Sequence, residues 1–136
     1  MLDLKKNDPA VKAEAGFTFN LELPDGTIAE KTTITVRGAQ SPAVKNYGRK
    51  VYQEFKMKEQ AAKRRGKEVE ELSLEDAEEL AVESAVVRVI GWSGIGEDGK
   101  EIPFSKEECT RILTAYPFIR MQVMEQSDNI LNFFRQ

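Results

Sequence analysis

The chain has 136 residues, of which 40% are hydrophobic and 32% are charged, and its formal net charge is −3. It contains no histidine, the commonest general base and transition-metal ligand. The one cysteine, Cys109, excludes an internal disulfide and favours a reducing compartment. We therefore expect a single-domain, non-catalytic protein with no cofactor, no metal and no small-molecule substrate. No apolar run is long enough to predict a membrane span.

The first 37 residues predict an arm followed by a hairpin. Residues 1–15 are polar and predict a flexible N-terminal arm ahead of one domain over residues 16–136. The arm lacks the apolar segment of a secretion signal, so we expect no export. Residues 17–23 alternate apolar and polar side chains, a Pro-Asp-Gly turn follows, and the alternation resumes over residues 28–37. This pattern predicts a β-hairpin.

About four helices are expected after the hairpin, giving an α+β fold. Ser41, Ser73 and Ser105 each stand where a capping hydroxyl would begin a helix, and Pro117 begins the last one. The first helix should end near Gly66. Residues 85–90 are apolar nearly all round, and we interpret them as the buried end of the second helix, which stops at Gly91.

A glycine-rich segment, residues 94–100, matches a dinucleotide fingerprint and nearly matches a phosphate loop. A phosphate loop needs Ser or Thr after its lysine and a helix directly behind it. Here Glu101 follows Lys100, and Glu97 and Asp98 would repel phosphate. The sequence predicts an ordinary Asp-Gly turn instead.

Charge is strongly segregated in the middle of the chain. Residues 42–67 hold nine basic and two acidic residues, and residues 68–83 hold eight acidic and none basic. Three interpretations stay open: two solvated faces, pairing between chains, or nucleic-acid binding through the basic helix, which the acidic block opposes. The charged residues expected to contact a partner or another copy are Lys56, Lys63, Arg64, Arg65, Glu75, Glu78 and Glu79.

Two aromatic residues flank the glycine-rich turn. Trp92, the only tryptophan, is interpreted either as a plug in the core or as a binding anchor, a role that tryptophan often has. Phe104 precedes the Ser105 cap and is placed to act as a hydrophobic staple. We expect both residues to hold the junction before the Ser105 helix, or to contact a partner.

Residues 87–134 resemble the tail assembly chaperones of long-tailed, lambda-like bacteriophages. In that family an apolar helix ends in Gly-Trp, an acidic-glycine turn follows, and an apolar-Pro-Phe-Ser run opens the next helix. The matching residues here are Gly91-Trp92, Asp98-Gly99, Ile102-Pro103-Phe104-Ser105, Tyr116-Pro117 and Asn132-Phe133.

The resemblance implies a non-catalytic assembly factor in the host bacterial cytoplasm. Such a chaperone binds the tape-measure protein, helps to recruit tail-tube subunits, and is absent from the mature virion. The family's genes often also make a longer, frameshifted product. From the charge pattern and the hairpin edge we separately expect self-association. The alternatives are a structural tail or head-tail joining subunit retained in the virion, and a small nucleic-acid-binding module.

Overall fold

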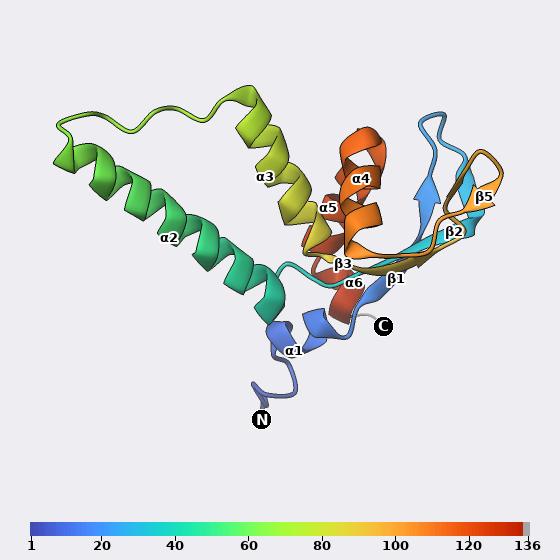
Figure 1. Cartoon of the computed structure of the whole chain (residues 1–136). Helices are drawn as coiled ribbons and strands as arrows, with labels where there is room; N and C mark the ends of the chain where they lie inside the picture. The colour runs from blue at the N-terminus through green and yellow to red at the C-terminus, as the bar shows by residue number, and fades with distance from the viewer. Residues whose placement is uncertain (135–136) are drawn as a thin grey trace.

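The structure is a computed structural model and describes residues 1–134 (Figure 1). Its helices are α1 (Pro9–Glu14), α2 (Pro42–Arg64), α3 (Leu74–Val86), α4 (Lys106–Ala115), α5 (Pro117–Asp128) and α6 (Leu131–Phe134). Its strands are β1 (Phe17–Glu22), β2 (Ile28–Val36), β3 (Val89–Ser93), β4 (Gly96–Glu97) and β5 (Lys100–Glu101). The N-terminal hairpin and the α+β class are confirmed.

A three-stranded antiparallel sheet in the order β1-β2-β3 forms the floor of the molecule. Ile34 in the central strand faces Phe19 of β1 on one side and Trp92 of β3 on the other. The hairpin therefore gains its third strand from a segment far along the chain. Helices α4 and α5 lie over this sheet in Figure 1, and α5 contacts both β1 and β2.

The prediction that residues 85–90 end a helix is wrong in its second half. Helix α3 stops at Val86, and Val89 begins β3, which pairs with β2. A short apolar run cannot be assigned to helix or strand by periodicity alone. Its β-branched residues suit a pleated strand, and the free edge of β2 supplies the hydrogen-bonding partners. Long-range pairing thus overrides the local helical pattern.

Helix starts follow the predicted caps. The hydroxyls of Ser41, Ser73 and Ser105 each accept a hydrogen bond from the amide three residues later, at 3.4, 3.0 and 3.1 Å. Each bond satisfies one of the backbone donors left open at a helix N-terminus. Pro117 occupies the first turn of α5, as expected. These boundaries are set by residues inside or next to each helix.

The N-terminal region differs from the expected flexible arm. Residues 9–14 form α1, which is capped by Asp8 and contacts α6. Ala13 is buried, and a Cβ added to Gly38 would stand 2.8 Å from the Cβ of Ala13 and 3.1 Å from the Phe133 ring. Only a glycine at position 38 lets the three segments approach this closely. The second half of the predicted arm is therefore packed.

The core lies between the sheet and α4, α5 and the end of α3. Its most deeply buried large side chains are Ile34, Val36, Ile112, Leu113 and Val123, each at most 1% exposed. Burying a side chain of this size contributes about 1.5–3 kcal/mol.

A buried charged residue, Arg88, lies at the edge of this core. The guanidinium of Arg88 is paired with Asp128 and also donates to the Ser127 hydroxyl. Asp128 balances the charge of this arginine through one terminal nitrogen, while its buried Nε has no hydrogen-bond partner among the described residues.

Helix α2 behaves differently from every other long helix. None of its 23 residues is buried, and Figure 1 shows it extending away from the sheet, with α3 diverging from the same root. At that root, the Tyr47 hydroxyl donates to a Glu83 carboxylate oxygen at 3.1 Å. We call residues 42–81, the part of α2 and α3 outside the core, the helical projection.

Candidate protein-interaction site

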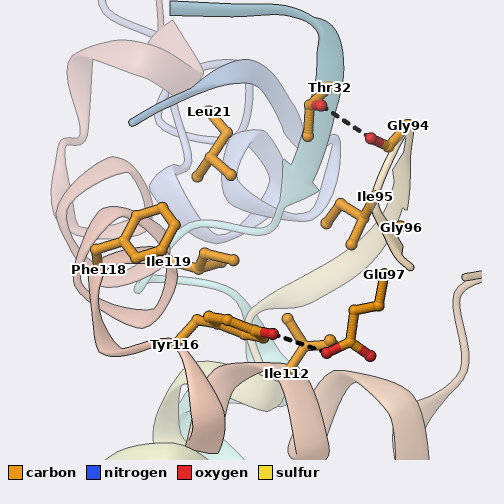
Figure 2. A pocket seen from close by; sticks show the side chains of 10 residues that line it. All are labelled: Leu21, Thr32, Gly94, Ile95, Gly96, Glu97, Ile112, Tyr116, Phe118 and Ile119. Atoms are coloured by element: carbon orange, nitrogen blue, oxygen red, sulfur yellow. Dashed lines mark hydrogen bonds between the residues drawn. The ribbon is translucent and has the colours of Figure 1, made fainter. Parts of the chain in front are cut away.

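An apolar pocket of about 250 Å³ opens between the sheet, the β4–β5 hairpin and the junction of α4 and α5 (Figure 2). Its lining residues are Leu21, Thr32, Gly94, Ile95, Gly96, Glu97, Ile112, Tyr116, Phe118 and Ile119. Glu97 is the only lining residue that carries a charge, and most of the other side chains are aliphatic or aromatic. The pocket can therefore take an apolar group but offers little for chemistry.

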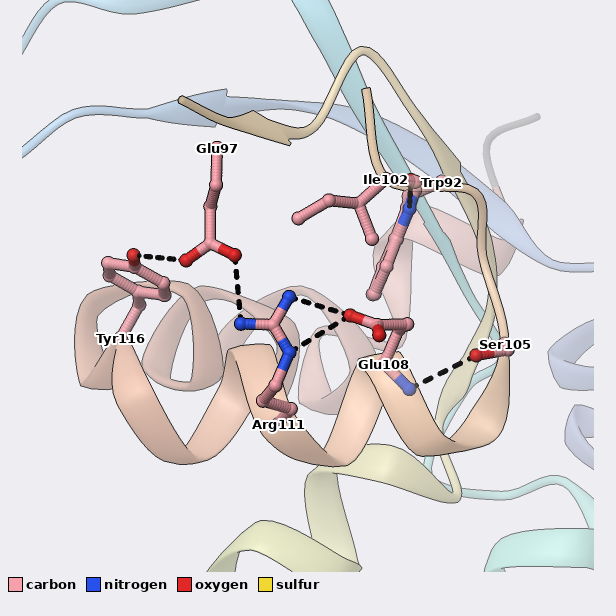
Figure 3. Close-up of polar contacts among 7 residues, drawn as sticks. All are labelled: Trp92, Glu97, Ile102, Ser105, Glu108, Arg111 and Tyr116. Carbon is pink, nitrogen blue, oxygen red and sulfur yellow. Dashed lines mark hydrogen bonds and ion pairs between the residues drawn. The ribbon is translucent and has the colours of Figure 1, made fainter. Parts of the chain in front are cut away.

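A polar chain closes one side of the pocket (Figures 2 and 3). The Tyr116 hydroxyl donates to Glu97 at 2.7 Å, and Arg111 pairs with the other Glu97 oxygen at 2.8 Å. Arg111 also donates to Glu108 at 2.6 and 3.0 Å. These bonds tie the β4–β5 hairpin to α4, so the pocket rim is held in place.

The same contacts shift the pKa values of the rim. The hydrogen bond from Tyr116, and then the one from Arg111, lower the pKa of Glu97. Hydrogen bonding to Glu97 raises the pKa of Tyr116, and the bonds to Glu108 and Glu97 raise that of Arg111. The rim is therefore a carboxylate held between a neutral phenol and a guanidinium at neutral pH.

Trp92 and Phe104 pack against each other near the start of α4. Their ring centroids are 5.0 Å apart in an edge-to-face arrangement, and the Trp92 indole donates to the carbonyl of Ile102 at 2.8 Å (Figure 3). Trp92 is half-buried and Phe104 is 37% exposed. The pair fastens the segment between β5 and α4 onto β3, and one face of it stays open to a partner.

The glycine-rich segment forms the predicted turn. Asp98 and Gly99 have φ values of 52° and 78° at the tip of the β4–β5 hairpin, the backbone of a type I′ turn. Gly94 adopts φ +75°, and a Cβ there would stand 2.0 Å from the carbonyl oxygen of Lys31. These glycines allow a tight hairpin to cross β2, and no helix follows at once as a phosphate loop requires.

The charged residues predicted as contacts fall on the helical projection. Lys56 and Lys63 both pair with Glu59 within α2, at 3.7 and 3.6 Å. Arg64 and Arg65 are exposed at the far end of α2. On the other side, Glu75, Glu78 and Glu79 are exposed on α3. Within residues 1–134, no ion pair joins the two helices.

Cys109 is fully buried, and burial raises the pKa of its thiol to about 12. Such a thiol is unreactive at neutral pH. Within the described part of the chain, no cluster of three or more His, Cys, Asp or Glu residues could hold a metal ion. Nor does any helix there combine the length and apolar character needed to cross a bilayer.

The pocket was not predicted, and none of the residues predicted as partner contacts lines it. Its walls come from β1, β2, the β4–β5 hairpin, α4 and α5, which approach one another only through tertiary packing. The Glu97–Arg111 pair spans 14 positions, so no local pattern indicates it. Only the mixed apolar and aromatic residues around Tyr116-Pro117 could have marked the α4–α5 junction as a candidate.

Fold and site define a small α+β protein whose distinctive surfaces are an apolar pocket and a charged helical projection. A family model of the YdaY prophage proteins matches residues 39–136. The chain therefore belongs to the YdaY prophage protein family and is phage-derived. No curated protein and no solved structure matches it.

Proposed function

We propose that this phage-derived chain is a non-catalytic tail assembly chaperone. It binds the tape-measure protein in the host cytoplasm, helps to recruit tail-tube subunits, and does not remain in the mature virion. Membership of a prophage family supports the phage context, and the resemblance over residues 87–134 supports the tail-assembly role. The observation that carries the proposal is the apolar pocket with its fixed rim.

The size of the pocket favours a protein ligand. Small-molecule sites usually enclose about 300–1,000 Å³, whereas this open pocket has about 250 Å³. It suits one or two apolar side chains presented by a helix. Burying each such side chain contributes about 1.5–3 kcal/mol. A long helical partner can present many such side chains in succession.

The surroundings of the pocket suit the same kind of ligand. Two aromatic residues, Tyr116 and Phe118, line it, and Arg111 pairs with Glu97 at its rim. Aromatic residues and arginine are enriched at protein-protein interfaces and in their binding hot spots. A helix whose apolar face enters the pocket would therefore meet aromatic side chains at its border.

Co-expression with a candidate tape-measure protein tests the proposal. We expect the wild-type chain to keep that protein soluble, and Tyr116→Ser to lose the rescue because the pocket loses its aromatic wall. Met121→Ser is the matched control, since Met121 is 67% exposed on α5 and does not line the pocket. Rescue by a folded Tyr116→Ser variant would exclude the pocket.

Composition of purified phage particles provides the second test. A chaperone should be absent from them, whereas a structural tail or head-tail joining subunit should be detected by mass spectrometry at stoichiometric amounts. Detection at that level would refute the chaperone role. Failure of the wild-type chain to rescue the candidate tape-measure protein would count equally against it.

A further inference from the structure

The two helices from which the helical projection is built, α2 and α3, carry equal and opposite charges over their full lengths. Helix α2 has seven basic and two acidic residues, a net charge of +5, and α3 has five acidic and no basic residues, a net charge of −5. These charges are not neutralised between the two helices. Among residues 1–134, the ion pairs of α2 all involve its own Glu59, and the hydrogen bonds between α2 and α3 come from Tyr47 at the root.

The projection also exposes apolar side chains that a soluble monomer normally covers. On α2, Tyr52, Phe55 and Met57 are 60%, 51% and 70% exposed. On α3, the other arm of the V in Figure 1, Leu74 is 77% exposed, and small exposed residues follow at positions 77 and 81. Large side chains on one helix and small ones on another permit close helix packing.

We propose that two copies of this chain pair through their helical projections, with α2 of each copy against α3 of the other. A second copy is the occupant that the charges favour, because each chain offers both a +5 helix and a −5 helix. Two-fold pairing uses both contacts at once, as closed dimers do. The four helices then form a bundle whose interior receives Phe55 and Leu74 and whose neighbouring surfaces carry opposite charge.

The sheet edges do not provide this contact. The sequence led us to expect the hairpin edge to take part, but β3 covers the edge of β2. On the outer edge of β1, the Gln122 side chain accepts from the Glu22 amide at 2.8 Å and donates to its carbonyl at 2.7 Å. The remaining open backbone of β1 is short, so the charged helices are the better interface.

Pairing through exposed charges should depend on concentration and salt. Ions screen such interactions over about 10 Å at 0.1 M salt. We therefore expect dimers in low salt at micromolar to millimolar concentration and dissociation as the salt rises. The pairing does not rest on the tape-measure proposal, although a dimer would present two pockets to one long partner and gain avidity.

A charge swap tests the proposal. One variant carries Lys63→Glu, Arg64→Glu and Arg65→Glu, and a second carries Glu75→Lys, Glu78→Lys and Glu79→Lys. Each alone should dissociate at least about tenfold more readily, because like charges now face each other. An equimolar mixture should regain association in sedimentation velocity, because in a mixed dimer the reversed charges on α2 of one copy meet the reversed charges on α3 of the other, and the second contact is that of the wild type.

Two controls keep the result decisive. Lys31→Glu, Lys100→Glu and Lys106→Glu together make the same charge change on exposed residues outside the projection and should leave association unchanged. Phe55→Ser keeps all charges and should weaken association. This variant tests the interface if circular dichroism shows that a charge variant is unfolded. A monomeric wild type in low salt, or a mixture of folded swap variants that stays monomeric, would overturn the proposal.

Discussion

The body of the protein, residues 1–41 and 82–134, and its helical projection are both rich in capped helices, but only the body buries them. Helix α5 has 12 residues and buries Ile119, Val123 and Ser127, which recur every fourth position. Helix α2 has 23 residues and a Ser41 cap, which α5 lacks, but no buried residue. Local signals therefore determine where a helix begins, whereas the density of apolar side chains determines whether the chain itself covers it.

The largest expected difference between the two regions is in the rate at which a cysteine is alkylated. Cys109 is completely buried and its pKa is raised to about 12, so alkylation near pH 8 must await unfolding. For a domain stable by about 5 kcal/mol or more, this slows labelling at least about 1,000-fold. A cysteine placed at exposed position 57, in the Cys109→Ala background, should react at the rate of a free thiol. Equal rates at the two positions would contradict the division.

Side-chain truncation should show the same division in stability. Ile112 is 1% exposed and Phe55 is 51% exposed. Ile112→Ala should lower the free energy of unfolding by about 2–5 kcal/mol, through lost burial and the cavity left behind. Phe55→Ala should change it by about 0.5 kcal/mol or less in a dilute, high-salt sample. Urea denaturation followed by circular dichroism measures both. A large decrease in the free energy of unfolding of Phe55→Ala would show that α2 packs on the body.

The residues that could be predicted correctly are those whose signal is local. Capping hydroxyls at Ser41, Ser73 and Ser105 act on amides three positions away, so helix starts follow directly from the sequence. Alternation over residues 17–37 likewise identifies the hairpin, because both strands expose one face and are joined by a short turn.

The features that escaped prediction depend on distant partners. Val89 becomes part of a strand because β2 has an edge to offer it. Tyr116 and Glu97 define the pocket rim only after α4 has packed against the β4–β5 hairpin. Trp92 shows the intermediate case: its importance was predicted, but its partial burial depends on where Phe104 and Ile102 come to lie.

The Trp92–Phe104 contact should be worth less than a fully buried pair. Trp92→Ala should cost about 1–3 kcal/mol, below the 3–5 kcal/mol of a buried tryptophan, since the side chain is only half-buried. Trp92→Phe should recover part of the loss, because a ring remains but the bond to Ile102 is absent. Thermal unfolding measures the order of the three proteins. If Trp92→Ala keeps the wild-type melting temperature but no longer binds its partner, then Trp92 serves as a binding anchor and does not stabilise the fold.

The smallest predicted effect concerns the hinge between the two regions. Tyr47 joins α2 to α3 through its hydrogen bond to Glu83. Tyr47→Phe should therefore cost about 0.5–1.5 kcal/mol at pH 7. Tyr52→Phe is the matched control and should be neutral, because the hydroxyl of Tyr52, 60% of whose surface is exposed, makes no hydrogen bond within residues 1–134.

Alkaline titration gives the same bond a second signature. Burial, and then the hydrogen bond and charge of Glu83, raise the pKa of Tyr47 to about 12. Folding favours the protonated phenol of Tyr47. Its contribution to the free energy of unfolding is therefore complete below the unfolded-state pKa of about 10, and it is lost as the pH rises to about 12. Absorbance titration should show that the amplitude near pH 12 is smaller by one phenol in Tyr47→Phe than in the wild type. If both curves coincide, Tyr47 is solvated and the two regions are hinged by other contacts.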